Sequence, residues 1–353
     1  MYFAVKRVLV FNFLGGVIDR GIPLYTQDIA ECMRRVGLQV VELRCPRILR
    51  RAPRMVRNAL FSIFEQLVAP VTRVVCGCAI TVYPYNSAGL IDAVLGRSVL
   101  VVHDLISNRR DTRKLAAIYI RCTQAFHRRL GRPICAASAH TLTCLRRLPA
   151  FSRCPLYLWS NPFYAFEAVV AGPRPPAERV ARRTGVLLCS GLGNNKDYAG
   201  ALSLFAHSKA LQDVELRIIG FGDDAHLARR RVQKLPRAIR DRIVVLPRLS
   251  LSEIAAEYTN SDLTWVHSRS EGFGRSIVEA RLCGRPVVAS RIGAFQKFAQ
   301  TPGVYLYRSE DFDATVVAAL GGESTPRLDA AEFHDLLESA VREVLQNRAT
   351  DAA

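Results

Sequence analysis

The apolar and polar positions in the first half of the chain alternate between short apolar runs and longer amphipathic stretches. The short runs lie at 7–13, 38–44, 74–83, 98–104 and 133–138, and the amphipathic stretches lie at 22–37 and 113–131. The runs have the length of strands, and the stretches have the length and spacing of helices. Strands that alternate with helices predict a parallel sheet with helices on both faces.

The same alternation starts again after a proline-rich segment. The sequence AGPRPPAER at 171–179 has the composition of a linker. Beyond it, strand-like runs lie at 184–191, 214–220, 242–247 and 262–267, and helix-like stretches lie at 197–211, 224–235, 251–258 and 275–284. The pattern predicts an α/β protein of two doubly wound, Rossmann-like domains, 1–165 and 180–325, with a cleft between them and a final helix within 326–353.

The run EGFGRSIVE places Glu271 and Glu279 on either side of a glycine turn. A strand is predicted before this turn and a helix after it. Gly272 and Gly274 allow backbone amides to approach a ligand closely, and the helix start adds N–H donors and the positive end of the helix dipole. The turn therefore favours phosphate, and the flanking carboxylates favour a sugar attached to that phosphate.

Two other interpretations of these glutamates remain to be weighed. Eight helical residues span about 12 Å, whereas the two carboxyl groups of a glycosidase lie about 5 to 9.5 Å apart. Two contacts along one extended ligand therefore fit better than a glycosidase pair. The structural alternative is that Glu271 complements the helix dipole from the first turn and that Glu279 is a solvated helix residue.

The twenty residues EGFGRSIVEARLCGRPVVAS at 271–290 resemble the signature of the retaining glycosyltransferases of family 4, which have the GT-B fold. The resemblance implies that Glu271 contacts hydroxyls of the donor sugar and that Glu279 holds the ribose of the nucleotide. It also implies that the intervening backbone binds the diphosphate and that the last helix crosses back to the first domain. The intervening residues are Gly272, Phe273, Gly274, Arg275 and Ser276.

Glycines also follow the first predicted strand, a position that permits backbone contact with phosphate. Gly21 fits best, because it begins a stretch with the spacing of the G-G-I-x-x-Y loop of the same family. The matching positions are Gly21, Ile22, Tyr25 and Gly37, with Arg20 in place of the first glycine. Gly15 and Gly16 are alternates if the loop is longer, and a glycine turn without a ligand is the structural alternative.

His103 and Lys196 are the other two candidates for the site. His103 ends the apolar strand SVLVV, and its string VHDL resembles that of the same family, which implies a hydrogen bond to the donor sugar. SGLGNNKDYAGAL at 190–202 resembles the family's G-R-x-x-x-K-N, with Leu192 at the Arg position. Lys196 is thus expected to neutralise the diphosphate, with Arg275 as a further candidate. The alternatives are a structural histidine and an exposed lysine.

The net charge of +18 is concentrated in the first half of the chain. Residues 1–160 contain 24 Lys/Arg against 8 Asp/Glu, and residues 161–353 contain 25 against 23. Six arginines alternate with apolar residues before Glu65, a pattern that suits an anionic membrane surface. They are Arg44, Arg47, Arg50, Arg51, Arg54 and Arg57.

The prolines in this arginine-rich segment predict a turn followed by a helix from about residue 53. Phe61 and Phe64 are expected to be exposed on that helix. A solvated arginine face is the alternative, and no RNA-binding aromatic motif or helix-turn-helix pattern supports nucleic acid as the partner.

Other classes of site receive no support from the sequence. The ten cysteines are scattered through apolar stretches, which is typical of small core residues in a reducing compartment. Asp311 and Asp313 form a DxD string but are expected to start a helix, so no metal and no cofactor are assigned. No uncharged apolar run reaches 18 residues, and a cytoplasmic protein bound peripherally to the membrane is expected.

Together with these features, the resemblance implies a retaining, metal-independent glycosyltransferase with Glu271 and His103 in catalytic positions. It would transfer a sugar from a nucleoside-diphosphate sugar to a saccharide or lipid-linked saccharide, in polysaccharide or glycolipid synthesis. The alternatives are a relative that acts as a sugar-nucleotide epimerase or phosphorylase, and a non-catalytic polyanion-binding protein.

Overall fold

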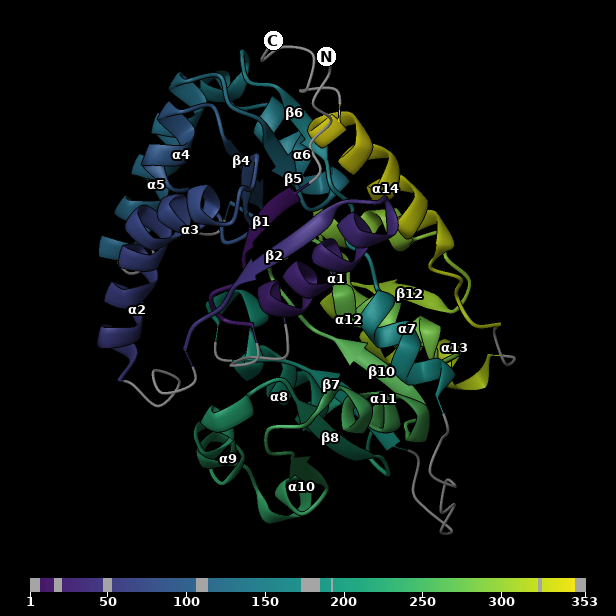
Figure 1. The fold of residues 1–353 in the computed structure, drawn as a ribbon. Helices are drawn as coiled ribbons and strands as arrows, with labels where there is room; N and C mark the ends of the chain where they lie inside the picture. The colour runs from purple at the N-terminus through teal and green to yellow at the C-terminus, as the bar shows by residue number, and fades with distance from the viewer. Residues whose placement is uncertain are drawn as a thin grey trace. The chain divides into compact units, whose positions relative to one another are not determined.

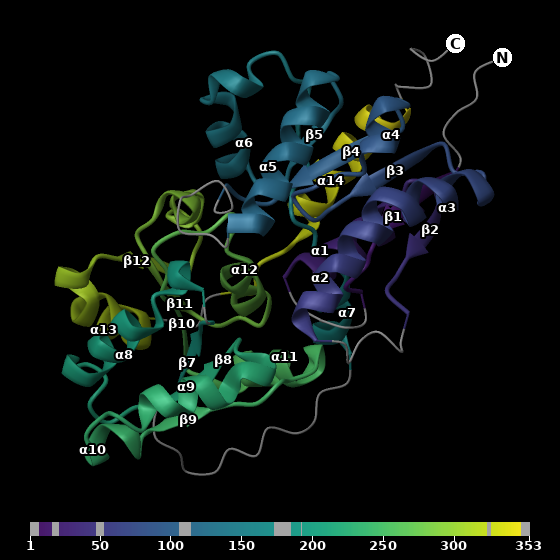
Figure 2. The same cartoon turned by 90° about the vertical axis from the view of Figure 1, so that its left-hand side faces the viewer.

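The computed structural model describes residues 7–15, 21–46, 53–105, 114–172, 185–191, 193–322 and 326–346. The chain divides into two compact units (Figures 1 and 2). Unit 1 consists of Met1–Ala165 and Ala330–Ala353, and unit 2 consists of Phe166–Asp329. Each unit contains one six-stranded parallel sheet with helices packed along it, which confirms the predicted α/β class.

The sheet of unit 1 has the strand order β2-β1-β3-β4-β5-β6. Its strands are β1 (Arg7–Phe11), β2 (Gln39–Leu43), β3 (Ile80–Tyr83), β4 (Ser98–Val102), β5 (Ile134–Ala136) and β6 (Leu156–Leu158). Its helices are α1 (Ile22–Arg35), α2 (Arg54–Ile63), the π-helical η2 (Phe64–Val68), α3 (Ala69–Val75), α4 (Leu90–Val94), α5 (Lys114–Arg129), α6 (Ala139–Arg146), the 3-10 turn η4 (Pro149–Phe151) and α14 (Ala331–Gln346). Helix α7 (Tyr164–Ala171) spans the division between the units.

Alternate residues of β1 face two separate hydrophobic clusters, as expected for a sheet covered on both faces. Val8 and Val10 lie in one cluster, and Leu9 and Phe11 lie in the other. Helix α14 completes the first cluster with four buried residues at helical spacing, Leu337, Val341, Val344 and Leu345. The last helix of the chain therefore belongs to the core of the first unit.

Two expectations for this unit are wrong. The predicted strand at 74–83 is confined to Ile80–Tyr83, because α3 continues to Val75 and Gly77, with φ +61°, turns the chain between the two elements. Phe61 and Phe64 are not exposed, because their rings pack edge-on against the buried Phe13. The predicted helix after Pro53 is confirmed, since α2 begins at Arg54 with Pro53 as its N-cap.

The sheet of unit 2 has the order β12-β11-β10-β7-β8-β9. Its strands are β7 (Gly185–Cys189), β8 (Glu215–Ile219), β9 (Ile243–Val245), β10 (Leu263–Val266), β11 (Val287–Ser290) and β12 (Val304–Tyr307). Its helices are α8 (Tyr198–His207), α9 (Ala225–Val232), α10 (Arg237–Arg240), α11 (Leu251–Asn260), α12 (Arg275–Leu282) and α13 (Phe312–Gly321), with 3-10 turns η5 (Asn194–Lys196), η6 (Gly222–Asp224), η7 (Gly293–Phe298) and η8 (Ser309–Asp311).

The strand order of unit 2 reverses at β7. The chain goes from β7 to β8 on one side, and the later β10 pairs with β7 on the other side. The loops that follow β7 and β10 therefore leave the sheet side by side at its carboxyl edge, which is where open α/β sheets bind ligands. Lys196 lies in the first of these loops and Glu271 in the second.

The DxD string at the start of α13 has a structural role. Asp311 is the N-cap residue of this helix, and the Asp313 carboxylate accepts hydrogen bonds from Ser208 Oγ at 2.5 Å and from the Lys209 backbone N–H at 3.0 Å. The second carboxylate thus ties α13 to the turn that follows α8.

Candidate functional site

Lys196 and Glu271 meet at the carboxyl edge of the second sheet. Lys196 Nζ lies 2.5 Å from Glu271 Oε1, and Ser268 Oγ donates to the same oxygen at 2.7 Å. The lysine side chain keeps 31% of its surface exposed and the glutamate 14%. The pair is therefore fixed by charge and hydrogen bonding but is still accessible to a ligand.

Two further hydrogen bonds join the loops that carry this pair. The Arg269 backbone N–H donates to Asn195 O at 2.7 Å, and Asn195 Nδ2 donates to Ser270 O at 3.1 Å. These bonds act between residues about 75 positions apart in sequence. They hold the loop after β7 against the loop after β10, so Lys196 faces Glu271.

Asp197 stabilises the backbone immediately after Lys196. This residue has φ +41° in the left-handed region and is the N-cap of α8, where its carboxylate accepts from the Gly200 backbone N–H. Its Oδ2 lies 2.9 Å from Arg269 Nε and 3.3 Å from His267 Nε2. Burial alone would raise the pKa of Asp197, but the hydrogen bonds from Arg269 and His267 lower it below its usual range.

The glycine turn before α12 ends at Gly274, and the helix begins at Arg275 as the sequence predicts. Gly274 has φ +98° and is the N-cap, and a Cβ on this residue would lie 2.6 Å from the Phe295 ring. Helix α12 therefore begins at Arg275, so Glu271 lies four residues before it and is not a first-turn residue. The expected 12 Å of helical rise between the two glutamates is wrong for the same reason.

The N-terminus of α12 presents its dipole toward the same turn. Ser276 is the second residue of the helix, where a backbone N–H has no acceptor within its own helix. Phe273 is nearly buried, with Lys297 Nζ 3.2 Å from the centre of its ring. The phenylalanine thus anchors the turn by packing, and the backbone around it is the part suited to an anion.

Glu279 is held by two neighbours rather than solvated. Tyr258 OH donates to Glu279 Oε2 at 3.2 Å, and Arg275 Nε lies 3.4 Å from Oε1. The Glu279 side chain keeps 12% of its surface exposed, and the Arg275 side chain keeps 13%. Arg275 therefore pairs with Glu279, and its role beside Lys196 on the diphosphate stays a prediction.

In unit 1, His103 follows β4 and its ring has a defined orientation. Its Nε2 lies 2.8 Å from Pro84 O, so this nitrogen carries a proton and donates. The His103 backbone N–H donates to Asn86 Oδ1 at 2.6 Å, and the Tyr25 ring packs edge-on at 4.6 Å from the His103 ring. The histidine thus makes structural hydrogen bonds while remaining at the carboxyl edge of its sheet.

Gly21 stands one helical turn before Tyr25. It has φ +61° and is the N-cap of α1, and its carbonyl accepts from the Tyr25 backbone N–H at 3.0 Å. A Cβ on Gly21 would meet nothing within 4 Å, so the glycine is needed for its backbone conformation and not for lack of space. Tyr25 connects this first turn of α1 to His103.

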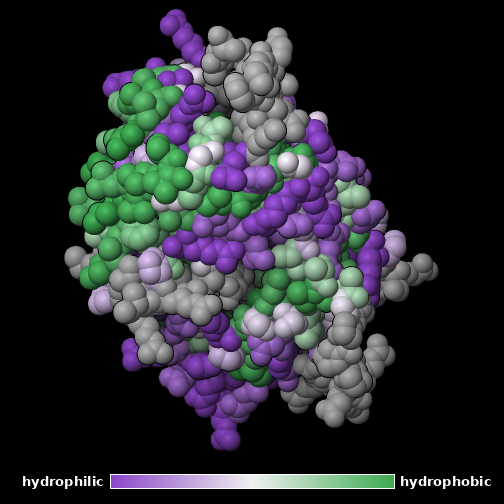
Figure 3. All heavy atoms as spheres, viewed as in Figure 1, coloured by the Kyte–Doolittle hydropathy of each residue, from purple (hydrophilic) through white to green (hydrophobic). Residues whose placement is uncertain are grey.

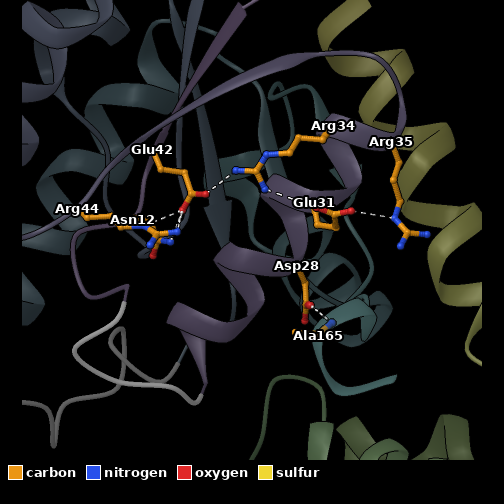
Figure 4. Close-up of polar contacts among 8 residues, drawn as sticks. All are labelled: Asn12, Asp28, Glu31, Arg34, Arg35, Glu42, Arg44 and Ala165. Atoms are coloured by element: carbon orange, nitrogen blue, oxygen red, sulfur yellow. Dashed lines mark hydrogen bonds and ion pairs between the residues drawn. The ribbon is translucent and has the colours of Figure 1, made fainter. Parts of the chain in front are cut away.

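The start of the loop after β1 is fixed by the Glu42 carboxylate (Figure 4). Asn12 Nδ2 donates to Glu42 Oε2 at 2.8 Å, and the same carboxylate pairs with Arg34 and Arg44 at 2.6 and 2.8 Å. Burial alone would raise the pKa of Glu42, but the hydrogen bonds from Asn12, Arg44 and Arg34 lower it.

Several residues singled out in the sequence lie outside the described residues. They are Gly16, Arg20, Arg47, Arg50, Arg51 and Leu192, and the side chain of Arg54 at the start of α2. Arg57 is described and is half-buried on α2.

Three residues that hold the candidate site residues in place were not predicted from the sequence. They are Asn86, Asp197 and Tyr258. An Asp directly before a helical stretch is an N-cap signal, so Asp197 could have been found. Asn86 and Tyr258 act through contacts with residues distant in sequence, and no local pattern marks them.

Comparison with known proteins relates part of the chain to one family. Residues 179–304 match the sequence model of the family described as glycosyl transferases group 1. D-inositol 3-phosphate glycosyltransferase of Xylanimonas cellulosilytica is 32% identical over 87 residues, which are 24% of this chain and 21% of that protein. The match thus spans about a fifth of this curated relative.

Solved structures resemble the whole chain. Sucrose-phosphate synthase from Thermosynechococcus elongatus superposes with a TM-score of 0.65 at 15% identity, covering 98% of each chain. Anabaena Alr3699/HepE in complex with UDP-glucose gives a TM-score of 0.61 at 17% identity, again over 98% of each chain. Residues 179–304 therefore resemble the group 1 glycosyl transferases, and the chain as a whole has the two-domain GT-B fold of these solved structures.

Proposed function

We propose that this protein is a retaining glycosyltransferase that takes a sugar from a nucleoside-diphosphate sugar and transfers it to a saccharide or lipid-linked saccharide. The observation that carries the proposal is the contact between Lys196 and Glu271 at the carboxyl edge of the second sheet. The match of residues 179–304 to the family of group 1 glycosyl transferases supports it.

In this proposal the donor lies along the loops of unit 2. Lys196 and the N-terminus of α12 neutralise the diphosphate, Glu271 accepts hydrogen bonds from sugar hydroxyls, and Glu279 accepts them from the ribose. Lys196 then exchanges part of its contact with Glu271 for a phosphate oxygen. Ser268 Oγ continues to hold Glu271 Oε1 during this exchange, because its hydrogen bond does not depend on the lysine.

Unit 1 supplies the remaining proposed contacts. The motifs around Gly21 and His103 predict a backbone contact to a phosphate and a hydrogen bond from a sugar hydroxyl to His103 Nδ1, because Nε2 of this ring donates to Pro84 O. The contact of His103 Nε2 with Pro84 O and the packing of Tyr25 orient the imidazole before the sugar arrives, so little freedom is lost on binding.

The proposed reaction needs charge stabilisation more than proton transfer by the protein. The bond between the sugar carbon and the diphosphate oxygen breaks, and the acceptor oxygen bonds to the same face of that carbon. The acceptor proton passes to the leaving phosphate oxygen. Lys196 and the α12 amides stabilise the negative charge that develops on the diphosphate, without a metal ion.

We also propose that the protein works in the cytoplasm on a membrane surface, in polysaccharide or glycolipid synthesis. The charge excess of residues 1–160 supports this, because anionic lipids attract basic segments. Uridine nucleotides are the first donors to test, because the Anabaena relative was solved with UDP-glucose.

A thermal-shift titration with UDP, GDP and their sugars tests the proposal, because a ligand that binds the folded state raises its apparent stability. At least one nucleotide should stabilise the wild type, and Glu279→Ala should abolish the part of the shift that depends on the nucleoside. Incubation with the stabilising donor and candidate acceptors should then yield a glycoside with the donor's anomeric configuration.

Two results would count against this function. Near-normal turnover by both Glu271→Gln and His103→Ala would remove the proposed roles of these residues. A product that remains linked to the nucleotide, or a strict need for inorganic phosphate, would favour an epimerase or a phosphorylase.

A further inference from the structure

Three helices of unit 1 carry outward stripes of exposed apolar side chains. The first stripe runs along η2 and α3 and consists of Leu67, Val71, Val74 and Val75, which are 57%, 62%, 66% and 79% exposed. Their spacing of four, seven and eight residues from Leu67 places them on one side of the helix. Amphipathic helices normally turn such a stripe toward the core, and this one points to solvent.

Helices α4 and α5 continue the same surface. Ile91, Val94 and Leu95 on and just after α4 are 44% to 56% exposed, and Leu115 and Ile118 on α5 are 84% and 48% exposed. Helix α4 packs against both η2 and α5, so the three stripes are neighbours. We call these outward stripes the apolar face, and Figure 3 shows a broad hydrophobic area on the side where Figure 1 labels α3, α4 and α5.

The apolar face is not required to cover the core of unit 1. The opposite sides of the same helices already supply buried residues, such as Ala69 on α3, Ala93 on α4 and Ala117 on α5. A contiguous exposed apolar area of this kind marks an interaction surface in a folded protein.

The exposed charges described on the helices of the apolar face have one sign. Between residues 53 and 103 the sequence has two acidic residues, Glu65 and Asp92, and both are fully buried. Asp92 pairs with Arg73 at 2.8 Å, and Glu65 accepts from Ser87 Oγ at 2.6 Å. Helix α5 contains no acidic residue at all.

The exposed ionised side chains described beside the apolar face are therefore cations. Arg97 follows α4, and Arg121 and Arg129 lie on α5. Anionic lipid headgroups would complement these arginines, while acyl chains would cover the valines and leucines.

We propose that the apolar face of α3, α4 and α5 inserts into the headgroup boundary of an anionic bilayer, with the surrounding arginines on the lipid phosphates. This inference rests on the membrane association proposed above but not on the transfer reaction. It assigns a contact to a different surface from the arginine-rich segment before Glu65, whose own membrane contact stays a prediction. Among the described residues no helix has the length and apolar character to cross a membrane.

A second copy of the chain fits the apolar face less well. A symmetric dimer would place the same patch of each copy against the other. The arginines at its rim would then face arginines, and like charges across an interface oppose association. Lipid phosphates satisfy the same arginines.

Binding of the full chain to vesicles tests the inference. Flotation with vesicles of phosphatidylcholine and 30% phosphatidylglycerol should recover the wild type at low salt, with much less recovery on pure phosphatidylcholine. The triple variant Val71→Ser, Val75→Ser and Leu115→Ser should lower the partition coefficient by at least about tenfold, because three inserted apolar side chains are lost. A triple variant of exposed apolar residues elsewhere, Val317→Ser, Leu336→Ser and Val244→Ser, should bind as the wild type does.

A fluorescence measurement covers the case in which the triple variant fails to fold. The two native tryptophans, Trp159 and Trp265, are buried, so an added tryptophan reports its own surroundings. Leu115→Trp should show a blue-shifted emission on anionic vesicles, and Val317→Trp should not.

Three results would overturn the inference. Unchanged vesicle binding by the triple variant would mean that the arginines act alone. A dimer that the triple variant converts to a monomer, without vesicle binding, would identify a second copy as the partner. Absence of vesicle binding by the wild type would remove the membrane association as well, and nucleotide-induced thermal shifts would show separately whether the donor site stands.

Discussion

Lys196 Nζ contacts Glu271 Oε1 at 2.5 Å, although the two residues are 75 positions apart in the chain. Their loops become neighbours because β7 and β10 pair in the sheet. The contact places a cation and a carboxylate where the strand order reverses, which is the usual ligand-binding position in such a sheet. In the proposed function, the donor offers a phosphate to Lys196 and sugar hydroxyls to Glu271.

Lys196→Ala should lower kcat/KM by about 10² to 10³ with the cognate donor, because one preorganised charge on the leaving diphosphate is lost. The melting temperature should change little, since a partly exposed ion pair contributes roughly 0 to 1 kcal/mol. Lys234→Ala is the matched control, because Lys234 is an exposed lysine of the same unit. Equal turnover by both variants would remove Lys196 from the mechanism.

Tyr258→Phe should weaken nucleotide binding about fivefold to tenfold, because Glu279 loses the hydroxyl that orients its Oε2. Calorimetric titration with the free nucleotide measures this effect without turnover. Tyr305→Phe removes a hydroxyl from β12 of the same unit and should bind as the wild type does. If Glu279→Ala lost nucleotide binding while Tyr258→Phe kept it, the tyrosine would have no positioning role.

Gly274→Ala should destabilise the protein by about 1 to 3 kcal/mol, because an added Cβ meets the Phe295 ring and the backbone conformation disfavours a side chain. The same change should weaken donor binding, since the turn carries the proposed phosphate contacts. In Gly321→Ala the new Cβ meets open space near the end of α13, and stability should be equal or higher. Urea denaturation of the two variants separates these outcomes.

The sequence pattern predicted the elements better than the contacts between them. The predicted strand 262–267 and helix 275–284 match β10 and α12, because periodicity is a local property. The prediction of a strand over the whole run 74–83 was wrong, because a glycine turn within this apolar run joins the end of a helix to a short strand. The hydrogen bond from Tyr258 to Glu279 depends on how two helices pack, which no local pattern encodes.

The sequence also did not predict whether the apolar side of a helix faces the core or the solvent. Phe61 and Phe64 were expected at the surface but pack on Phe13, whereas Val71 and Val75 lie at the surface. Periodicity shows that a helix has an apolar side. It does not show whether that side meets the core of its own domain or another partner.

Glu65 lies in the π-helical turn of unit 1 and is fully buried, with hydrogen bonds from Ser87 and Tyr119. Burial raises the pKa of Glu65 to about 7, against an ordinary value of 4.5. The folded protein therefore holds this group protonated under conditions in which the unfolded chain has already released the proton. The contribution of Glu65 to the free energy of unfolding is therefore fully present below about pH 4.5 and is lost as the pH rises through about 7.

Glu65→Gln keeps a neutral side chain of similar shape at every pH. The free energy of unfolding of the wild type, relative to that of Glu65→Gln, should fall by on the order of 3 kcal/mol between pH 4.5 and pH 8. Urea denaturation of both proteins across this range measures the difference, and the other titrating groups cancel in the comparison. Tyr119→Phe should move the window to higher pH, because it removes a hydrogen bond that favours the ionised carboxylate. Parallel pH profiles for the wild type and Glu65→Gln would show that Glu65 is ionised in the folded protein throughout this range.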